Sequence, residues 1–139
     1  MSTFPPRECG MATFTKDLVD SMDKKFNPAL KSEVLAINDN GSSIYNYDDK
    51  VNFQIDQSNM EDYISIAKEI NGRKDIKLVN IQHEFGIFGG DAGSHLLPFL
   101  EKVKKPVVVT LHSVVPAPDE HKKRIVNTIF RKASAVVVM

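Results

Sequence analysis

The strongest constraint on the fold is an alternation between short β-branched runs and longer segments with helical spacing. The clearest buried strands are predicted at residues 78–81 and 107–111, residues 34–37 form another apolar run, and residues 51–55 and 135–138 are two further strand candidates. Continuous apolar runs of this length are typical of strands that are buried on both faces. Their separation by helical segments predicts an α/β fold, a Rossmann-like parallel sheet with helices on both faces.

Four segments have the apolar spacing of amphipathic helices. The first covers about residues 12–25, the second follows a capping box formed by Ser58 and Glu61, the third contains Pro98, and the last follows Pro118. The side chains predicted to face the sheet include Phe14, Leu18, Val19, Met22, Met60, Tyr63, Ile64, Ala67, Ile70, Leu96, Leu97, Leu100, Val103, Ile125, Val126, Ile129, Phe130 and Ala133. A turn at residues 38–41 should end the strand before it.

Composition limits the class of protein. The chain has 139 residues, which suits one compact domain, and its 18 Lys and Arg balance its 18 Asp and Glu. A balanced charge provides no large positive field for nucleic acid or an anionic bilayer, and no apolar run approaches a transmembrane length. The single cysteine, Cys9, and the lack of a secretory signal at the N-terminus favour the cytoplasm.

The ends of the chain suggest a partial domain. Residues 1–4 contain no full apolar run that could form the first strand of a doubly wound sheet, and residue 139 falls within the last predicted strand. A missing strand would leave backbone groups unpaired beside it. We therefore expect marginal stability or self-association through an incomplete sheet.

Three segments are candidates for a ligand site, because ligands of open α/β sheets bind beyond the carboxyl ends of the strands. Gly10 lies where the first helix begins, and the free N–H groups there could bind a phosphate. Residues 82–93 follow a strand and contain four glycines with His83, Glu84 and Asp91, which could bind sugar hydroxyls or a metal. His112 emerges from the most hydrophobic strand, where it could donate a hydrogen bond to a phosphate or a sugar hydroxyl.

Each candidate also has a purely structural interpretation. A glycine at a helix start more often relieves a steric clash than binds a ligand, and a single histidine at a strand end is more often structural. The glycine-rich loop could equally be a demanding turn with solvated charges. No HExxH or paired Cys/His pattern accompanies the histidines, so we predict no metal site. Cys9 lacks a nucleophile motif, and Asp119 most simply complements the dipole of the last helix.

Taken together, three motifs resemble successive landmarks of family 4 glycosyltransferases. These are PPRECGMATFT at residues 5–15, NIQHEFGIFGG at residues 80–90 and PVVVTLHS at residues 106–113. They occur in the family's order, the resemblance covers essentially the whole chain, and the second motif is closest to a mannosyltransferase-like subgroup. The resemblance implies part of the N-terminal half of a GT-B fold, whose C-terminal, donor-binding domain and paired-glutamate motif are absent here.

The resemblance also assigns roles to residues. Gly10 and Met11 would approach the donor diphosphate, His112 would contact the transferred sugar as a catalytic-site residue, and the acceptor side would be lined by His83, Glu84, Gly86, Gly89 and Gly90. The family retains anomeric configuration, uses a nucleotide-sugar donor such as a GDP- or UDP-sugar, and requires no cofactor or divalent metal for catalysis. The acceptor would be a carbohydrate or another hydroxyl compound.

Two other functional classes are kept beside this expectation. The main alternative is a noncatalytic nucleotide- or sugar-phosphate-binding Rossmann module, or an interaction protein with the same fold. A metal-dependent hydrolase is a third class and would require bound metal. Under the leading expectation, this chain alone is an inactive portion of a sugar-transferring enzyme.

Overall fold

The computed structural model, which describes residues 1–39 and 45–139, confirms the α/β class. In chain order the elements are α1 (Gly10–Phe26), β1 (Val34–Asn38), β2 (Val51–Asp56), α2 (Met60–Gly72), β3 (Val79–His83), the 3-10 turn η1 (Asp91–Gly93), α3 (Leu96–Lys102), β4 (Val107–Leu111), α4 (Glu120–Lys132) and β5 (Ala135–Val138). From β2 onward its strands alternate with helices as the sequence pattern predicts, whereas β1 is followed by β2 in the order of the elements. None of the helices in the described ranges is long and apolar enough to cross a membrane.

The strands form two parallel sheets, β1-β2 and β3-β4-β5. Between them lies the extended N-terminal segment, which the sequence pattern did not identify as a strand. Ser2 forms a parallel bridge with Ala36 and donates from its backbone N–H to the Leu35 carbonyl at 3.1 Å. On its other side, the Met1 amino group donates to the Asn80 carbonyl at 2.7 Å, and the Gln82 N–H donates to the Met1 carbonyl at 3.1 Å.

We expected unpaired backbone groups where the first strand of the sheet is missing. That expectation is wrong for the stretch between β1 and β3, because residues 1 and 2 bond to both strands. The segment 1–3 takes the first-strand position and joins the sheets in the order β2-β1-(1–3)-β3-β4-β5. The sequence did not reveal it because two or three residues are too short to carry an apolar run. Their pairing comes from strands on both sides rather than from local pattern.

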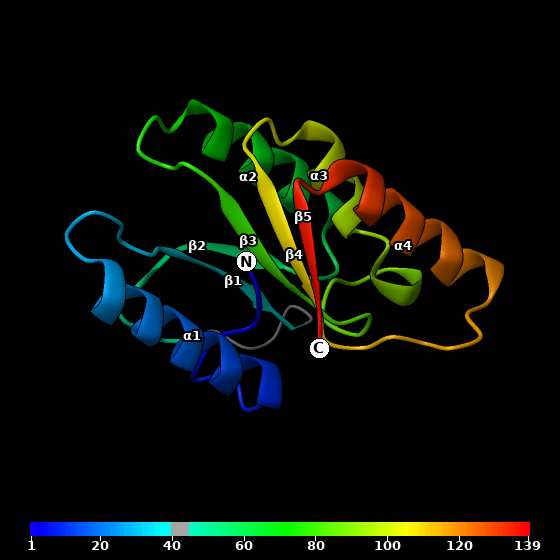
Figure 1. The fold of residues 1–139 in the computed structure, drawn as a ribbon, viewed down its shortest axis with the longest axis horizontal. Helices are drawn as coiled ribbons and strands as arrows, with labels where there is room; N and C mark the ends of the chain where they lie inside the picture. The colour runs from blue at the N-terminus through cyan, green and yellow to red at the C-terminus, as the bar shows by residue number, and fades with distance from the viewer. Residues whose placement is uncertain (40–44) are drawn as a thin grey trace.

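Helices cover both faces of this composite sheet (Figure 1). Leu35 and Ile37 of β1 belong to the core shared with α2, α3 and α4, whereas Val34 and Ala36 pack with Val19 of α1 on the other face. The alternation follows from the period of two in a strand. α1 begins below the carboxyl ends of the strands, so its first turn lies at the edge where ligands of such sheets bind.

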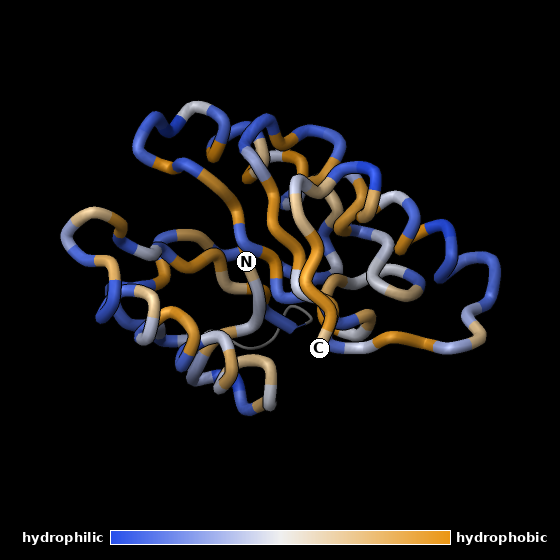
Figure 2. The backbone as a smooth tube through the Cα atoms, in the orientation of Figure 1, coloured by the Kyte–Doolittle hydropathy of each residue, from blue (hydrophilic) through white to orange (hydrophobic). Residues whose placement is uncertain are grey.

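Most of the apolar residues are concentrated in the strands and the inward helix faces, and polar residues dominate the outer helix surfaces (Figure 2). Ile125 and Ile129 of α4 and Tyr63 of α2 are fully buried, as the helical spacing predicts. The prediction is wrong at two positions. Met60 is 44% exposed because it is the first residue of α2, and Phe130 is 50% exposed because it lies on the outward side of α4.

The helix starts are partly as expected. The cap of α2 is Asn59 and not Ser58, because the Asn59 side chain accepts from the Glu61 N–H, whereas Ser58 bonds to the Asp56 carboxylate. Asp119 caps α4 by accepting from the backbone N–H of Lys122. β1 ends at Asn38, the first residue of the turn predicted at 38–41, and residues 40 and 41 of that turn lie outside the described part of the chain.

Candidate functional site

Polar side chains gather where β3 and β4 end. The backbone N–H of His112 donates to the His83 carbonyl at 3.0 Å, which extends the ladder between the two strands by one step. His112 is thereby held one residue past the end of β4, at the carboxyl edge of the sheet, and Glu84 follows His83 at the same edge. This is the edge where parallel α/β sheets bind ligands.

His112 is anchored by a glutamine of the neighbouring strand. Its Nε2 lies 2.8 Å from Oε1 of Gln82, a side chain that is only 2% exposed. The hydroxyl of Ser113 donates to the Glu84 carboxylate next to this pair. Desolvation lowers the pKa of His112 below its usual value, and the nearby Glu84 opposes that shift. The imidazole is therefore mainly neutral at neutral pH.

The first turn of α1 lies beside His112. Gly10 is the first residue of α1, and Phe14, one turn later, meets the His112 ring edge to face with ring centroids 4.7 Å apart. The first turn contains no acidic side chain. The N–H groups of Ala12 and Thr13 donate to the Cys9 carbonyl, whereas those of Gly10 and Met11 precede the first intrahelical bond and have no acceptor among the described residues. The structure thus brings Gly10, Met11 and His112 to one end of the sheet, in an arrangement that suits an anionic group.

His83 lies elsewhere. Residues 79, 81 and 83 of β3 point into the core shared with α2, α3 and α4, so His83 is on the opposite face of the sheet from Gln82 and His112. Its ring stacks on Phe88 at 5.6 Å between centroids, meets Phe85 edge to face, and is fully buried. Neither ring nitrogen has a hydrogen-bond partner among the described residues, and desolvation lowers the pKa of His83 to about 4.

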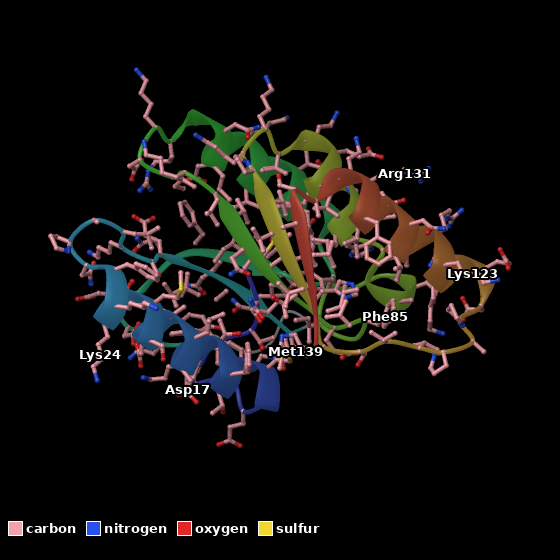
Figure 3. The ribbon with its side chains drawn as sticks, in the orientation of Figure 1. Asp17, Lys24, Phe85, Lys123, Arg131 and Met139 are labelled. Carbon is pink, nitrogen blue, oxygen red and sulfur yellow. The ribbon has the colours of Figure 1, made fainter. Side chains whose placement is uncertain are left out.

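The glycine-rich loop borders a separate hollow of about 540 Å³. Its lining residues are Gln57, Ser58, Phe85, Gly86, Gly89, Gly90, Asp91, Ala92, His95 and Lys122. Phe85 extends from the loop after β3 at the carboxyl end of the sheet (Figure 3). His95 Nδ1 lies 3.0 Å from the Gln57 carbonyl, which ties the loop to the end of β2. The hollow offers the Phe85 ring, the Lys122 ammonium group and the Asp91 carboxylate.

Another hollow, of about 500 Å³, lies on the outward face of α4 between Lys123 and Arg131 (Figure 3). It is far from the strand ends, and none of the residues predicted to form the site lines it. Within residues 1–39 and 45–139, no group of three or more His, Cys, Asp or Glu side chains could hold a metal ion.

No protein-family model, curated protein or solved structure matches this chain. The assignment of a function therefore rests on the motifs and on the geometry of the site. Among the residues that the structure adds to that site, Gln82, Ser113 and Phe14 were not predicted. The one available signal was residue number. In β3 and β4 the even-numbered residues face away from the core shared with α2, α3 and α4, so Gln82 and His112 lie on the same face of the sheet. This becomes informative only once the register, with Gln82 opposite Thr110, is known.

The burial of His83 should make stability depend on pH. Because its pKa falls from an ordinary value of 6.5 to about 4 in the folded protein, the unfolded chain binds more protons between these values. The contribution of His83 to the free energy of unfolding should therefore be fully present above about pH 6.5 and fall by roughly 3 kcal/mol as the pH drops to about 4. Urea titrations at a series of pH values measure this slope.

His83→Leu provides the control for that slope. The variant should lose the part of the dependence that His83 supplies between about pH 6.5 and 4, while a slope of the same sign should remain between about pH 8 and 5 because burial also lowers the pKa of the Met1 amino group from 8.0 to about 5. An unchanged slope in His83→Leu would show that His83 is not the group responsible.

Proposed function

We propose that this chain is the acceptor-side, N-terminal part of a retaining glycosyltransferase that moves a sugar from a nucleotide-sugar donor to an acceptor hydroxyl. One observation carries the proposal. Gly10 and Met11 at the start of α1 lie beside the anchored His112 at the carboxyl edge of the sheet, through the contact of Phe14 with the His112 ring. These are the residues to which the motifs assign the diphosphate and the transferred sugar.

The roles in the proposed reaction follow from the chemistry of each group. As the donor's glycosidic bond breaks, negative charge grows on the leaving diphosphate, and N–H groups in the first turn of α1 are suited to stabilise it. His112 contacts the transferred sugar. The leaving phosphate accepts the proton of the attacking hydroxyl, so the protein supplies orientation and electrostatic stabilisation rather than a nucleophile.

The acceptor is assigned to the glycine-rich side. Glu84 is bonded to Ser113 next to His112, while Gly86, Gly89 and Gly90 line the hollow at the end of β2. His83 is buried under Phe88 and contributes to acceptor binding only by supporting this loop. Phe85 presents an aromatic face at the hollow, which is suited to the C–H surface of a sugar ring.

The test is calorimetric titration with a GDP-sugar and a UDP-sugar. We expect no binding tighter than about 1 mM to this chain alone, and measurable binding with transfer of labelled sugar when the chain is joined to a donor-binding domain of a family 4 glycosyltransferase. The free nucleotides serve as the control for contributions from the base alone. The absence of binding and transfer from the joined protein, in a form that melts cooperatively, would contradict the proposal.

The alternative is a noncatalytic nucleotide- or sugar-phosphate-binding module. It is favoured by the same helix start, since N–H groups at the beginning of α1 could hold a phosphate without any reaction. Binding in the micromolar range by this chain alone, without transfer from the joined protein, would support the module. Two further expectations stay predictions: a cytoplasmic location and self-association, for which β5 provides an edge with Val137 48% exposed.

A further inference from the structure

We propose that Gln82 is a positioning residue that fixes the protonation tautomer of His112, so that His112 recognises a hydroxyl group of its ligand and not a phosphate oxygen. The significance of this for sugar transfer rests on the proposed function. The tautomer itself is a property of the chain and can be measured without any ligand.

The first step is the orientation of the Gln82 amide. Its Nε2 donates to Oδ1 of Asn80 at 2.7 Å on the same face of β3. The side chain is 2% exposed, and its backbone N–H is bonded to the Met1 carbonyl, so both the backbone and the amide are held. With Nε2 bonded to Asn80, the carbonyl oxygen Oε1 is the atom that faces His112.

The second step is the proton on His112. An amide oxygen can only accept a hydrogen bond, so the partner atom 2.8 Å away, His112 Nε2, must carry the hydrogen. The ring is held by the Phe14 contact, and the backbone by the bond to the His83 carbonyl. In the described ranges no hydrogen bond reaches Nδ1 of His112. That atom remains available as an acceptor.

The third step is the chemistry of the ligand. A neutral imidazole with hydrogen on Nε2 can accept from an O–H or N–H at Nδ1 but cannot donate to an anionic oxygen there. Burial favours this neutral form. His112 is therefore suited to a sugar hydroxyl, whereas a phosphate must be bound by other donors, such as the N–H groups at Gly10 and Met11.

Nitrogen-15 NMR of the histidine rings tests the inference directly. In the wild-type chain we expect His112 near neutral pH to show a protonated Nε2, a bare Nδ1 and a ring N–H proton that exchanges slowly enough to be observed. Adding inorganic phosphate should leave this tautomer unchanged, with Nε2 protonated and Nδ1 bare. A protonated Nδ1, in the free chain or after phosphate is added, would overturn the proposal.

Two variants test the part played by Gln82. Gln82→Leu should remove the observable ring proton and let the two tautomers mix, and Gln82→Glu should keep Nε2 protonated while raising the pKa of His112 by about one unit or more. Gln54→Leu on β2 is the matched control, because Gln54 is exposed and contacts Asn38 at the far edge of the sheet from β4. It should leave His112 unchanged.

The outcomes separate this inference from the proposed function. If Gln82→Leu retains the wild-type ring signals in a folded protein, Gln82 does not set the tautomer, whatever the chain binds. If Gln82→Leu fails to fold, the wild-type tautomer and the Gln82→Glu titration still decide the matter. If the tautomer is as expected but no nucleotide sugar binds to the joined protein, only the proposed function fails.

Discussion

Replacing His112 with alanine in a transfer-competent two-domain protein is expected to lower the rate of sugar transfer by about 10²- to 10³-fold. The substitution removes the polar group that the strand end, Gln82 and Phe14 hold at the edge of the sheet. It should cost only about 1 kcal/mol of stability, because His112 is not fully buried and water can replace its bond to Gln82.

Initial rates at saturating donor, together with the melting temperature of each variant, measure the two effects separately. His121→Ala is the matched control: it removes a partly exposed histidine from the start of α4, and its rate should stay within about twofold of the wild type. A His112→Ala protein that transfers sugar as fast as the control would remove His112 from the site.

The strands were predictable because their signal is local. The boundaries of β4 agree with the predicted residues 107–111, since five consecutive apolar or β-branched residues lie between Pro106 and His112. β3 extends two residues past its predicted end. Gln82 and His83 are polar, so hydropathy could not include them, but the ladder with Thr110 and Leu111 continues through both.

The faces of the first helix were harder to predict. Phe14, Leu18 and Met22 are only partly buried, whereas the polar side chains of Thr15 and Asp23 are buried. Thr15 donates to the hydroxyl of Ser2 in the N-terminal segment, and Asp23 pairs with Lys50, the residue just before β2. These partners come from other parts of the chain, so helical periodicity alone could not reveal which face is inward.

The site was predictable as a set of segments but not as a geometry. The motifs pointed to Gly10, His83 and His112, and the structure does place all three near the carboxyl edge of the sheet. The separation of His83 from His112 depends on strand register, because consecutive residues of β3 face opposite sides. The same alternation places the Gln82 side chain on the face of the sheet where His112 lies, and the His83 side chain on the other face.

The glycine-rich loop shows the same limit and leads to the second large effect. In the sequence, Gly86, Gly89 and Gly90 are equivalent members of one loop. In the structure, their backbone conformations and their surroundings differ. Gly89 has a φ of 64°, and a Cβ atom built there would lie 1.7 Å from the Gln57 carbonyl oxygen. At Gly86, a Cβ atom would meet nothing within 4 Å.

Gly89→Ala should therefore destabilise the protein by about 3 kcal/mol, the sum of a left-handed backbone cost and the displacement of a packed backbone oxygen. The melting temperature should fall by roughly 10 °C. Because the Gln57 carbonyl also bonds to His95 Nδ1, the loop should separate from the end of β2, and hydrogen exchange should rise in both segments.

Gly86→Ala is the matched control for this prediction, since it adds the same methyl group to the same loop. Gly86 is exposed and does not need a positive φ, so the variant should unfold within about 0.5 kcal/mol of the wild type. Equal losses in the two variants would mean that the loop tolerates alanine equally at both glycines, and that the close contact of Gly89 with Gln57 does not fix its position. A selective loss at Gly89 would show that this contact holds the loop on the end of β2, where it shapes the hollow assigned to the acceptor.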